Sequence, residues 1–188
     1  MSHIETKHIT DVYAIPGVFS KDECEKIIAL QKIWNPSVAQ VDLASDSVVD
    51  RKYRETMMYN CEIVPGWLYE KIREFSSLAN ENYRFDISGM MENPTLMEYN
   101  SPSGSYDWHL DIGPSPMSST RKISYSVILN DDFAGGDLEF MLTKDPTRHR
   151  HDSGTVIVFP SYILHRVLPV EAGTRWSLVG WIHGNSFR

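Results

Sequence analysis

The feature that most constrains the fold of this chain is a change of sequence pattern near residue 84. After this point helical periodicity disappears, and short runs rich in Val, Ile, Tyr, Phe and Trp alternate with clusters of Gly, Pro, Asn and Asp. The runs are 85–88, 95–99, 108–111, 123–129, 137–142, 155–159 and 175–183. Turn signals at roughly every 8–12 residues are typical of a β-sandwich or jelly roll.

Two helices are predicted before the change of pattern. Ser20 followed by Glu23 is a capping-box signature for the start of the first helix, and Pro36 is expected to end it. The second helix has Pro65 in its first turn and a single apolar face, formed by Leu68, Ile72, Phe75 and Ala79. Short strands are predicted at 11–15 and 55–61, and the polar stretch 37–54 is predicted to be a long loop.

The chain of 188 residues is therefore predicted to be one α+β, mainly β domain over 1–188, with a helical part at 1–84 and a β core at 85–184. A net charge of −7 argues against sequence-independent binding to nucleic acid or to an anionic membrane surface. No apolar run reaches the roughly 20 residues of a membrane span, and the first residues lack a signal-peptide pattern. We expect a cytoplasmic protein with two reduced cysteines, Cys24 and Cys61.

His109 and Asp111 are the first candidate site residues. Because positions i and i+2 of a strand point to one face, the imidazole and the carboxylate are predicted to project side by side, with Trp108 and Leu110 facing into packing. Such a pair with one distant histidine makes a 2-His-1-carboxylate metal site. The H-x-D spacing alone is common by chance in a chain with seven histidines, so a surface polar patch is the alternative.

The C-terminal segment supplies the remaining candidates. His165 comes near the end of a β-type segment, and Arg175 and Ser177 alternate onto one face with Val179 and Trp181. Since 169–173 reads as a turn, we expect His165 and Arg175 on neighbouring antiparallel strands. A guanidinium near a metal site offers a bidentate grip on an anionic co-substrate; the alternative for Arg175 is a surface arginine before a strand.

Taken together, these residues resemble those of the Fe(II)/2-oxoglutarate-dependent oxygenases, within them the prolyl-4-hydroxylase-like group that includes the PKHD-type hydroxylases. The resemblance covers most of the chain from residue 18 and is strongest over 95–184. It is carried by the stretches 97–99, 106–111, 121–124, 129–131, 135–140 and 159–181.

The resemblance implies a double-stranded β-helix of the jelly-roll, cupin-like type with the two N-terminal helices packed on it. It implies that His109, Asp111 and His165 are the iron ligands and that Arg175 binds the distal carboxylate of 2-oxoglutarate. Tyr99, ten residues before the first ligand, matches a tyrosine that donates to the same carboxylate, or it is a barrel-wall aromatic. Ser177 either assists as part of an R-x-S pair or is structural.

The predicted function is that of an Fe(II)- and 2-oxoglutarate-dependent dioxygenase that uses O2 and releases succinate and CO2, with ascorbate as a possible stimulant. The expected substrate is a peptide, protein or small amino acid, hydroxylated at an aliphatic C–H of a prolyl residue or a related side chain. A non-enzymatic metal- or small-acid-binding sensor is one alternative. An oxidative nucleic-acid demethylase is disfavoured, because relatives of that sort carry a second arginine where this chain has Trp181.

The oligomeric state is left open. The loops 37–54, 112–120 and 143–153 are expected to shape the substrate site, and His149 and His151 to lie in a solvated loop.

Overall fold

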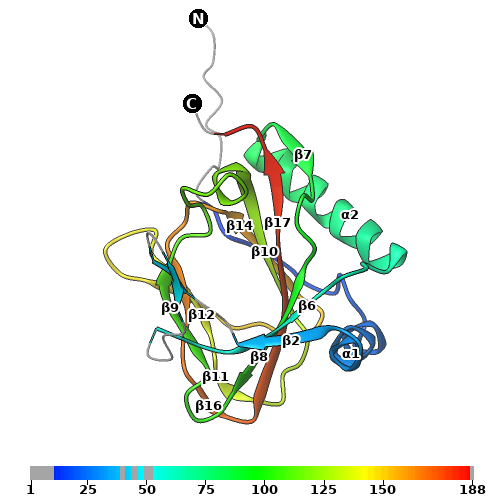
Figure 1. Cartoon of the computed structure of the whole chain (residues 1–188), viewed down its shortest axis with the longest axis vertical. Coiled ribbons are helices and arrows are strands. Elements are labelled where there is room, and N and C mark those ends of the chain that lie inside the picture. The colour runs from blue at the N-terminus through cyan, green and yellow to red at the C-terminus, as the bar shows by residue number, and fades with distance from the viewer. Residues whose placement is uncertain (1–10, 39–40, 44–45, 49–52, 187–188) are drawn as a thin grey trace, which may run out of the picture.

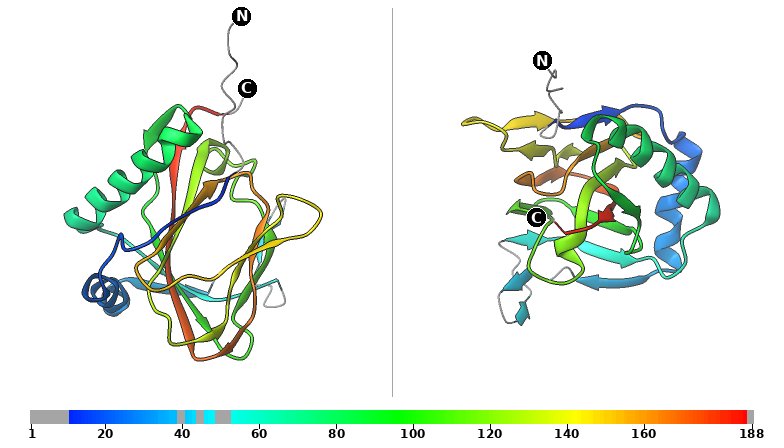
Figure 2. Two further views of the ribbon diagram at one scale, coloured as in Figure 1. Left: turned by 180° about the vertical axis from the view of Figure 1, so that it is seen from behind. Right: turned by 90° about the horizontal axis from the view of Figure 1, so that it is seen from above.

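A computed structural model describes residues 11–38, 41–43, 46–48 and 53–186, and side chains are described for all of these except 41–43 and 46–48. Two antiparallel sheets face each other and form a double-stranded β-helix, with α1 and α2 outside it on one side (Figures 1 and 2). The mainly β jelly-roll fold predicted from the sequence is confirmed.

The larger sheet has eight strands in the order β1-β14-β10-β17-β8-β6-β2, with β7 also paired to β17. Its strands are β1 (Tyr13–Ile15), β2 (Asn35–Val38), β6 (Met57–Asn60), β7 (Ile87–Gly89), β8 (Thr95–Asn100), β10 (Arg121–Ile128), β14 (Val156–Pro160) and β17 (Thr174–Gly184).

The smaller sheet has five strands in the order β13-β12-β15-β9-β5. They are β5 (Arg54–Glu55), β9 (Ser105–His109), β12 (Leu138–Phe140), β13 (Thr147–His149) and β15 (His165–Val167). Two further pairs lie outside the sheets: β3 (Val41–Leu43) with β4 (Asp46–Val48), and β11 (Ala134–Gly135) with β16 (Val170–Ala172).

The two predicted helices form, but the first ends at Ala29 rather than at Pro36, which lies in β2. α1 (Lys21–Ala29) has Ser20 as its N-cap with both hydrogen bonds of a capping box to Glu23, and a short 3-10 turn, η1 (Leu30–Lys32), follows it. α2 (Gly66–Tyr83) has Pro65 as its N-cap residue and buries the predicted face. No helix within the described residues has the length and apolar character of a membrane span.

The apolar core has two layers, one on each face of the larger sheet. The outer layer joins the buried faces of α1 and α2 to outward side chains of the sheet such as Ile123, Val158 and Leu178. The inner layer lies between the sheets and includes Met97, Phe140 and Phe159. Strand alternation thus buries both faces of the larger sheet and leaves the space between the sheets for a site.

Three details differ from the sequence-based predictions. The stretch 37–54 is not one long loop, because it contains the β3-β4 pair and ends in β5. The strand predicted at 55–61 is two strands, β5 in the smaller sheet and β6 in the larger, since the chain crosses between sheets at Thr56. The part before residue 84 is not only helical: β1, β2, β5 and β6 pair within the two sheets.

Candidate metal centre

Strand pairing places two imidazoles opposite each other in the smaller sheet. His109 is the last residue of β9, His165 is the first of β15, and the two are partners in the antiparallel register. Their ring centroids lie 4.1 Å apart. Residues 56 positions apart in the chain therefore present their nitrogen atoms to one point between the sheets.

Asp111 completes the cluster from just beyond the end of β9. Its backbone N–H donates to Ser161 O at 3.1 Å, which ties the segment after β9 to the turn after β14. Asp111 Oδ1 lies 3.8 Å from His109 Nε2, and Oδ2 lies 3.6 Å from His165 Nε2. The three candidate ligand atoms all lie within 4.8 Å of one another, a spacing that could hold a metal ion.

Both imidazoles are turned so that Nε2 points into the cluster. His109 Nδ1 lies 2.7 Å from Asp107 O, and His165 Nδ1 lies 2.9 Å from Ile163 O. A carbonyl oxygen only accepts, so each Nδ1 carries the proton and each Nε2 presents a lone pair. This backbone support is the arrangement that orients metal-binding histidines.

The electrostatics favour a neutral His109 imidazole beside a charged Asp111 carboxylate. Burial, together with the nearby His165, lowers the pKa of His109 to about 3. Burial by itself would raise the pKa of Asp111, but His165, His109 and side-chain hydrogen bonds from Ser124 and Trp181 hold that pKa below its ordinary value. The donor set is thus two nitrogen lone pairs and one carboxylate, which suits a divalent first-row metal and fits Fe(II).

Arg175 enters the same space from the larger sheet. It is only 1% exposed, and burial lowers the pKa of its guanidinium. Its Nη1 donates to Ser177 Oγ at 2.9 Å, and its guanidinium carbon lies 5.2 Å from the centre of the Tyr99 ring on β8. Within the described part of the chain no carboxylate hydrogen-bonds to it, so an anionic ligand would offset the cost of burying this charge.

Two neighbours hold the Arg175 side chain in place. Tyr99 is its partner in the β8-β17 register, and burial raises the pKa of the phenol, which therefore stays protonated and able to donate. Gly136 has a φ of +67°, and a Cβ there would lie 2.9 Å from Arg175 Cδ. The absence of a side chain at Gly136 thus leaves room for the arginine.

All these groups line one cavity of about 1090 Å³ between the sheets. The cavity includes the predicted set of His109, Asp111, His165, Arg175, Tyr99 and Ser177, together with Val179 and Trp181. It is large enough for a small dicarboxylate and part of a further molecule. Of the loops expected to shape it, 37–54 and 112–120 contribute lining residues, but 143–153 contributes none, because β13 lies at the far edge of the smaller sheet.

Three predictions of local geometry are wrong. His165 and Arg175 are not on neighbouring strands, because β16 intervenes and the chain crosses from the smaller to the larger sheet; the two face each other across the cavity. Leu110 does not face into packing but is 46% exposed. His149 lies in β13 rather than in a loop, with its ring 5.2 Å from that of Phe140.

Several lining residues were given no role from the sequence, although Tyr106 and Arg121 lie in stretches that carry the resemblance. The Tyr106 ring stacks on His109, with centroids 3.5 Å apart and an interplanar angle of 13°. The guanidinium of Arg54 also lies over the Tyr106 ring, with its central carbon 4.3 Å from the ring centre. Glu92 and Arg121 form an ion pair near Trp181. Only the i, i+3 spacing of Tyr106 and His109 is local enough to have been noticed.

Comparison with known proteins finds similar proteins over the segment that contains the candidate site residues. The sequence profile of the 2OG-Fe(II) oxygenase superfamily matches residues 94–183, slightly less than half of the chain. A PKHD-type hydroxylase of Synechococcus sp. is 35% identical over 89 residues, which are 46% of this chain and 40% of that protein. The chain thus matches about two fifths of the length of this relative. A PKHD-type hydroxylase of Pseudomonas fluorescens is 25% identical over 187 residues, covering 89% of this chain and 76% of that one.

Among solved structures, a prolyl-4-hydroxylase from Pseudomonas putida superposes with a TM-score of 0.69 at 19% identity. The match covers 94% of each chain. At this identity the likeness concerns the fold, and it agrees with the double-stranded β-helix described above.

Proposed function

We propose that this chain, whose residues 94–183 match the sequence profile of the 2OG-Fe(II) oxygenase superfamily, is an Fe(II)- and 2-oxoglutarate-dependent hydroxylase of an aliphatic C–H bond. One observation carries the proposal: the inward-facing ligand set of His109, Asp111 and His165 shares a cavity with the buried Arg175. A metal site alone would not need a buried cation opposite it, and the pair suits a ligand that binds metal at one end and carries a carboxylate at the other.

In this proposal His109, Asp111 and His165 hold Fe(II), and Arg175 binds the distal carboxylate of 2-oxoglutarate. Ser177 orients the guanidinium through the 2.9 Å hydrogen bond, and the Tyr99 hydroxyl donates to the same carboxylate. When bound, Fe(II) and 2-oxoglutarate supply the redox chemistry, in which R–H, 2-oxoglutarate and O2 give R–OH, succinate and CO2. The chain itself binds, orients and excludes water.

The substrate that we propose is a prolyl residue of a peptide or protein, or a related amino-acid side chain. Two features support it: the names of the relatives above, and the apolar part of the cavity wall. That wall includes Met58, Met97, Val179 and Trp181. An uncharged ring needs such a pocket, with only a few polar groups to orient it.

The test is a screen for substrate-dependent formation of succinate from 2-oxoglutarate with Fe(II) and ascorbate, using prolyl peptides, free amino acids and small metabolites. Mass spectrometry should show a gain of one oxygen on the active substrate, in step with succinate. Asp111→Ala is the control and should abolish both signals. Metal binding by the wild-type protein without succinate formation on any substrate would instead support a non-enzymatic sensor.

A further inference from the structure

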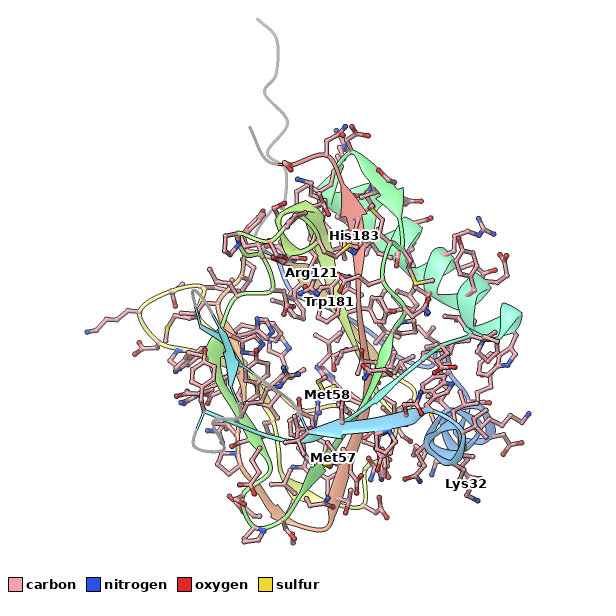
Figure 3. The ribbon with its side chains drawn as sticks, viewed as in Figure 1. Lys32, Met57, Met58, Arg121, Trp181 and His183 are labelled. Carbon is pink, nitrogen blue, oxygen red and sulfur yellow. The ribbon has the colours of Figure 1, made fainter. Side chains whose placement is uncertain are left out.

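A network of charged and aromatic side chains lies beside Asp111 and contacts it through Arg121 and Trp181. It consists of Glu92, Thr120, Arg121, Trp181 and His183, which come from three separate segments of the chain. Figure 3 labels Arg121, Trp181 and His183, whose side chains gather at the upper end of the barrel. Glu92, Arg121 and Trp181 also line the cavity.

Arg121 stands at the centre of this network. Its Nε and Nη2 donate to Glu92 Oε1 and Oε2 at 2.7 and 2.6 Å, which is a bidentate ion pair. Its third nitrogen, Nη1, donates to the backbone oxygen of Asp111 at 3.1 Å. The guanidinium plane also lies over Trp181, 3.5 Å from the ring centre. One side chain thus touches the backbone of a candidate metal ligand and the ring that hydrogen-bonds to its carboxylate.

Glu92 has a second neighbour on its other side. His183, whose side chain is fully buried, places Nε2 3.1 Å from Glu92 Oε1 without the alignment of a hydrogen bond, and its Nδ1 lies 2.9 Å from Thr120 Oγ1. The two hydrogen bonds from Arg121 therefore do most to hold the Glu92 carboxylate. They also keep the guanidinium on Glu92, and among the described ion pairs Arg121 has none with the Asp111 carboxylate.

We propose that Arg121 is a positioning residue for Asp111 and that Glu92 keeps its guanidinium from competing with the metal. Arg121 supports Asp111 at two points, directly through the backbone oxygen and indirectly by seating Trp181. Without Glu92, this cation would be free to turn to the carboxylate of Asp111, whose backbone oxygen it already contacts, and would then neutralise the ligand that the metal needs. The inference rests on the proposed metal centre and adds that its affinity depends on this ion pair.

The proposal predicts an order of metal affinities that a purely structural ion pair would not produce. Arg121→Gln should weaken metal binding by about 10- to 100-fold, the usual effect of removing support from a ligand. Arg121→Lys should lose less, because it keeps the charge but not the three-way contact. Glu92→Gln should weaken binding at least as much as Arg121→Gln, and the double variant Glu92→Gln/Arg121→Gln should bind metal no worse than Glu92→Gln alone.

The experiment is titration of each purified apo variant with Mn(II), with free metal followed by electron paramagnetic resonance, so that no turnover is required. Arg166→Gln is the matched control. Arg166 also places two nitrogens on a glutamate, with Nε and Nη2 at 2.8 and 2.7 Å from Glu139 Oε2, and also lies over a tryptophan, 4.5 Å from the centre of the Trp108 ring. It makes no contact with Asp111 among the described interactions, so its metal affinity should match that of the wild type.

Three results would overturn the inference: unchanged affinity in Arg121→Gln, losses that add in the double variant, or an equal loss in Arg166→Gln. Thermal unfolding of the apo proteins checks that each variant is folded, and if Arg121→Gln is not, Glu92→Gln and Arg121→Lys carry the same comparison. A wild-type protein that binds no Mn(II) would overturn the metal centre and this inference together. Wild-type binding with no effect of Arg121 or Glu92 would overturn the inference alone.

Discussion

At the scale of the residue, Arg175 shows the strongest conflict between burial and charge. Its guanidinium is 1% exposed, and its described hydrogen-bond partner is the neutral Ser177 Oγ. Arg175→Ala should therefore weaken 2-oxoglutarate binding by about 10- to 150-fold, the equivalent of about 1.5–3 kcal/mol for a charge-assisted hydrogen bond. Arg175→Lys should rescue only part of the loss, because an ammonium lacks the planar fork.

Calorimetric titration of 2-oxoglutarate into the Mn(II)-loaded variants measures this directly. Metal affinity should stay close to that of the wild type, since Arg175 lies on the larger sheet and the three candidate ligands lie on or beside the smaller one. An unchanged affinity for 2-oxoglutarate in Arg175→Ala would assign the carboxylate to another group, with Tyr99 the first to examine.

The sequence predicts pairs of site residues that are close together in the chain, and it misses pairs that are distant in the chain but adjacent in the fold. His109 and Asp111 are two positions apart, and Arg175 and Ser177 alternate on one strand, so their proximity follows from strand geometry. Glu92 and Arg121 are 29 positions apart, and nothing in either segment indicates that they pair. Charged residues are common on any surface, so such pairs become visible only when the fold brings them together.

At the scale of the element, α1 shows how a local sequence signal, the capping box of Ser20 and Glu23, fixes where a helix begins. Ser20 accepts from Glu23 N and Glu23 accepts from Ser20 N, while Lys71 of α2 hydrogen-bonds to Glu23 and links the two helices. Ser20→Ala should lower the free energy of unfolding by about 0.5–2 kcal/mol. Ser77→Ala, at an exposed position within α2, should change it little. Urea unfolding measures both, and equal losses in the two variants would contradict the capping role.

The smaller sheet has its own charged cluster on the outer side. Glu139 on β12 accepts from Arg148 on β13 and Arg166 on β15, so one carboxylate links three adjacent strands. Burial by itself would raise the pKa of Glu139, but the two arginines hold it below its ordinary value. A lowered pKa in the folded state means that Glu139 stabilises the protein above its unfolded-state pKa and that this stability is lost as pH falls through the folded-state pKa.

Glu139→Gln should therefore be less stable than the wild type at pH 7, by about 1–3 kcal/mol. The difference should shrink as both proteins are taken down towards pH 3, where the wild-type carboxylate becomes protonated. Urea unfolding across this pH range measures the difference. A gap between the two proteins that stays constant with pH would show that the carboxylate charge plays no part.

Strands were predictable where they are long and buried, and less so where the chain changes sheets. The runs at 123–129, 155–159 and 175–183 correspond to β10, β14 and β17, because runs rich in β-branched and aromatic residues between turn signals are typical of strands. β5 and β6 read as one strand in the sequence, since a crossing at the single residue Thr56 leaves no turn signal. His165 and Arg175 are predicted on neighbouring strands because 169–173 reads as a simple turn, whereas it contains β16 and the chain changes sheets there.

At the scale of the whole molecule, the site depends on two sheets that close over one cavity. The smaller sheet presents both histidines, the segment after β9 presents Asp111, and the larger sheet presents Arg175. Strands from before residue 84 extend both sheets, with β5 next to β9 and β6 next to β8. The pattern of strands predicted this fold class, whereas the pairing of distant segments required the structure.

The most direct test of the central claim is the number of Fe(II) ions bound per chain, measured by equilibrium dialysis without oxygen. We expect one ion per wild-type chain and a large loss of affinity in Asp111→Ala, which removes the charged member of the ligand set. Arg166→Gln removes a charge outside the cavity, so this variant, once it is checked to be folded, should still bind one ion. A full equivalent of Fe(II) bound by Asp111→Ala with wild-type affinity would contradict the account.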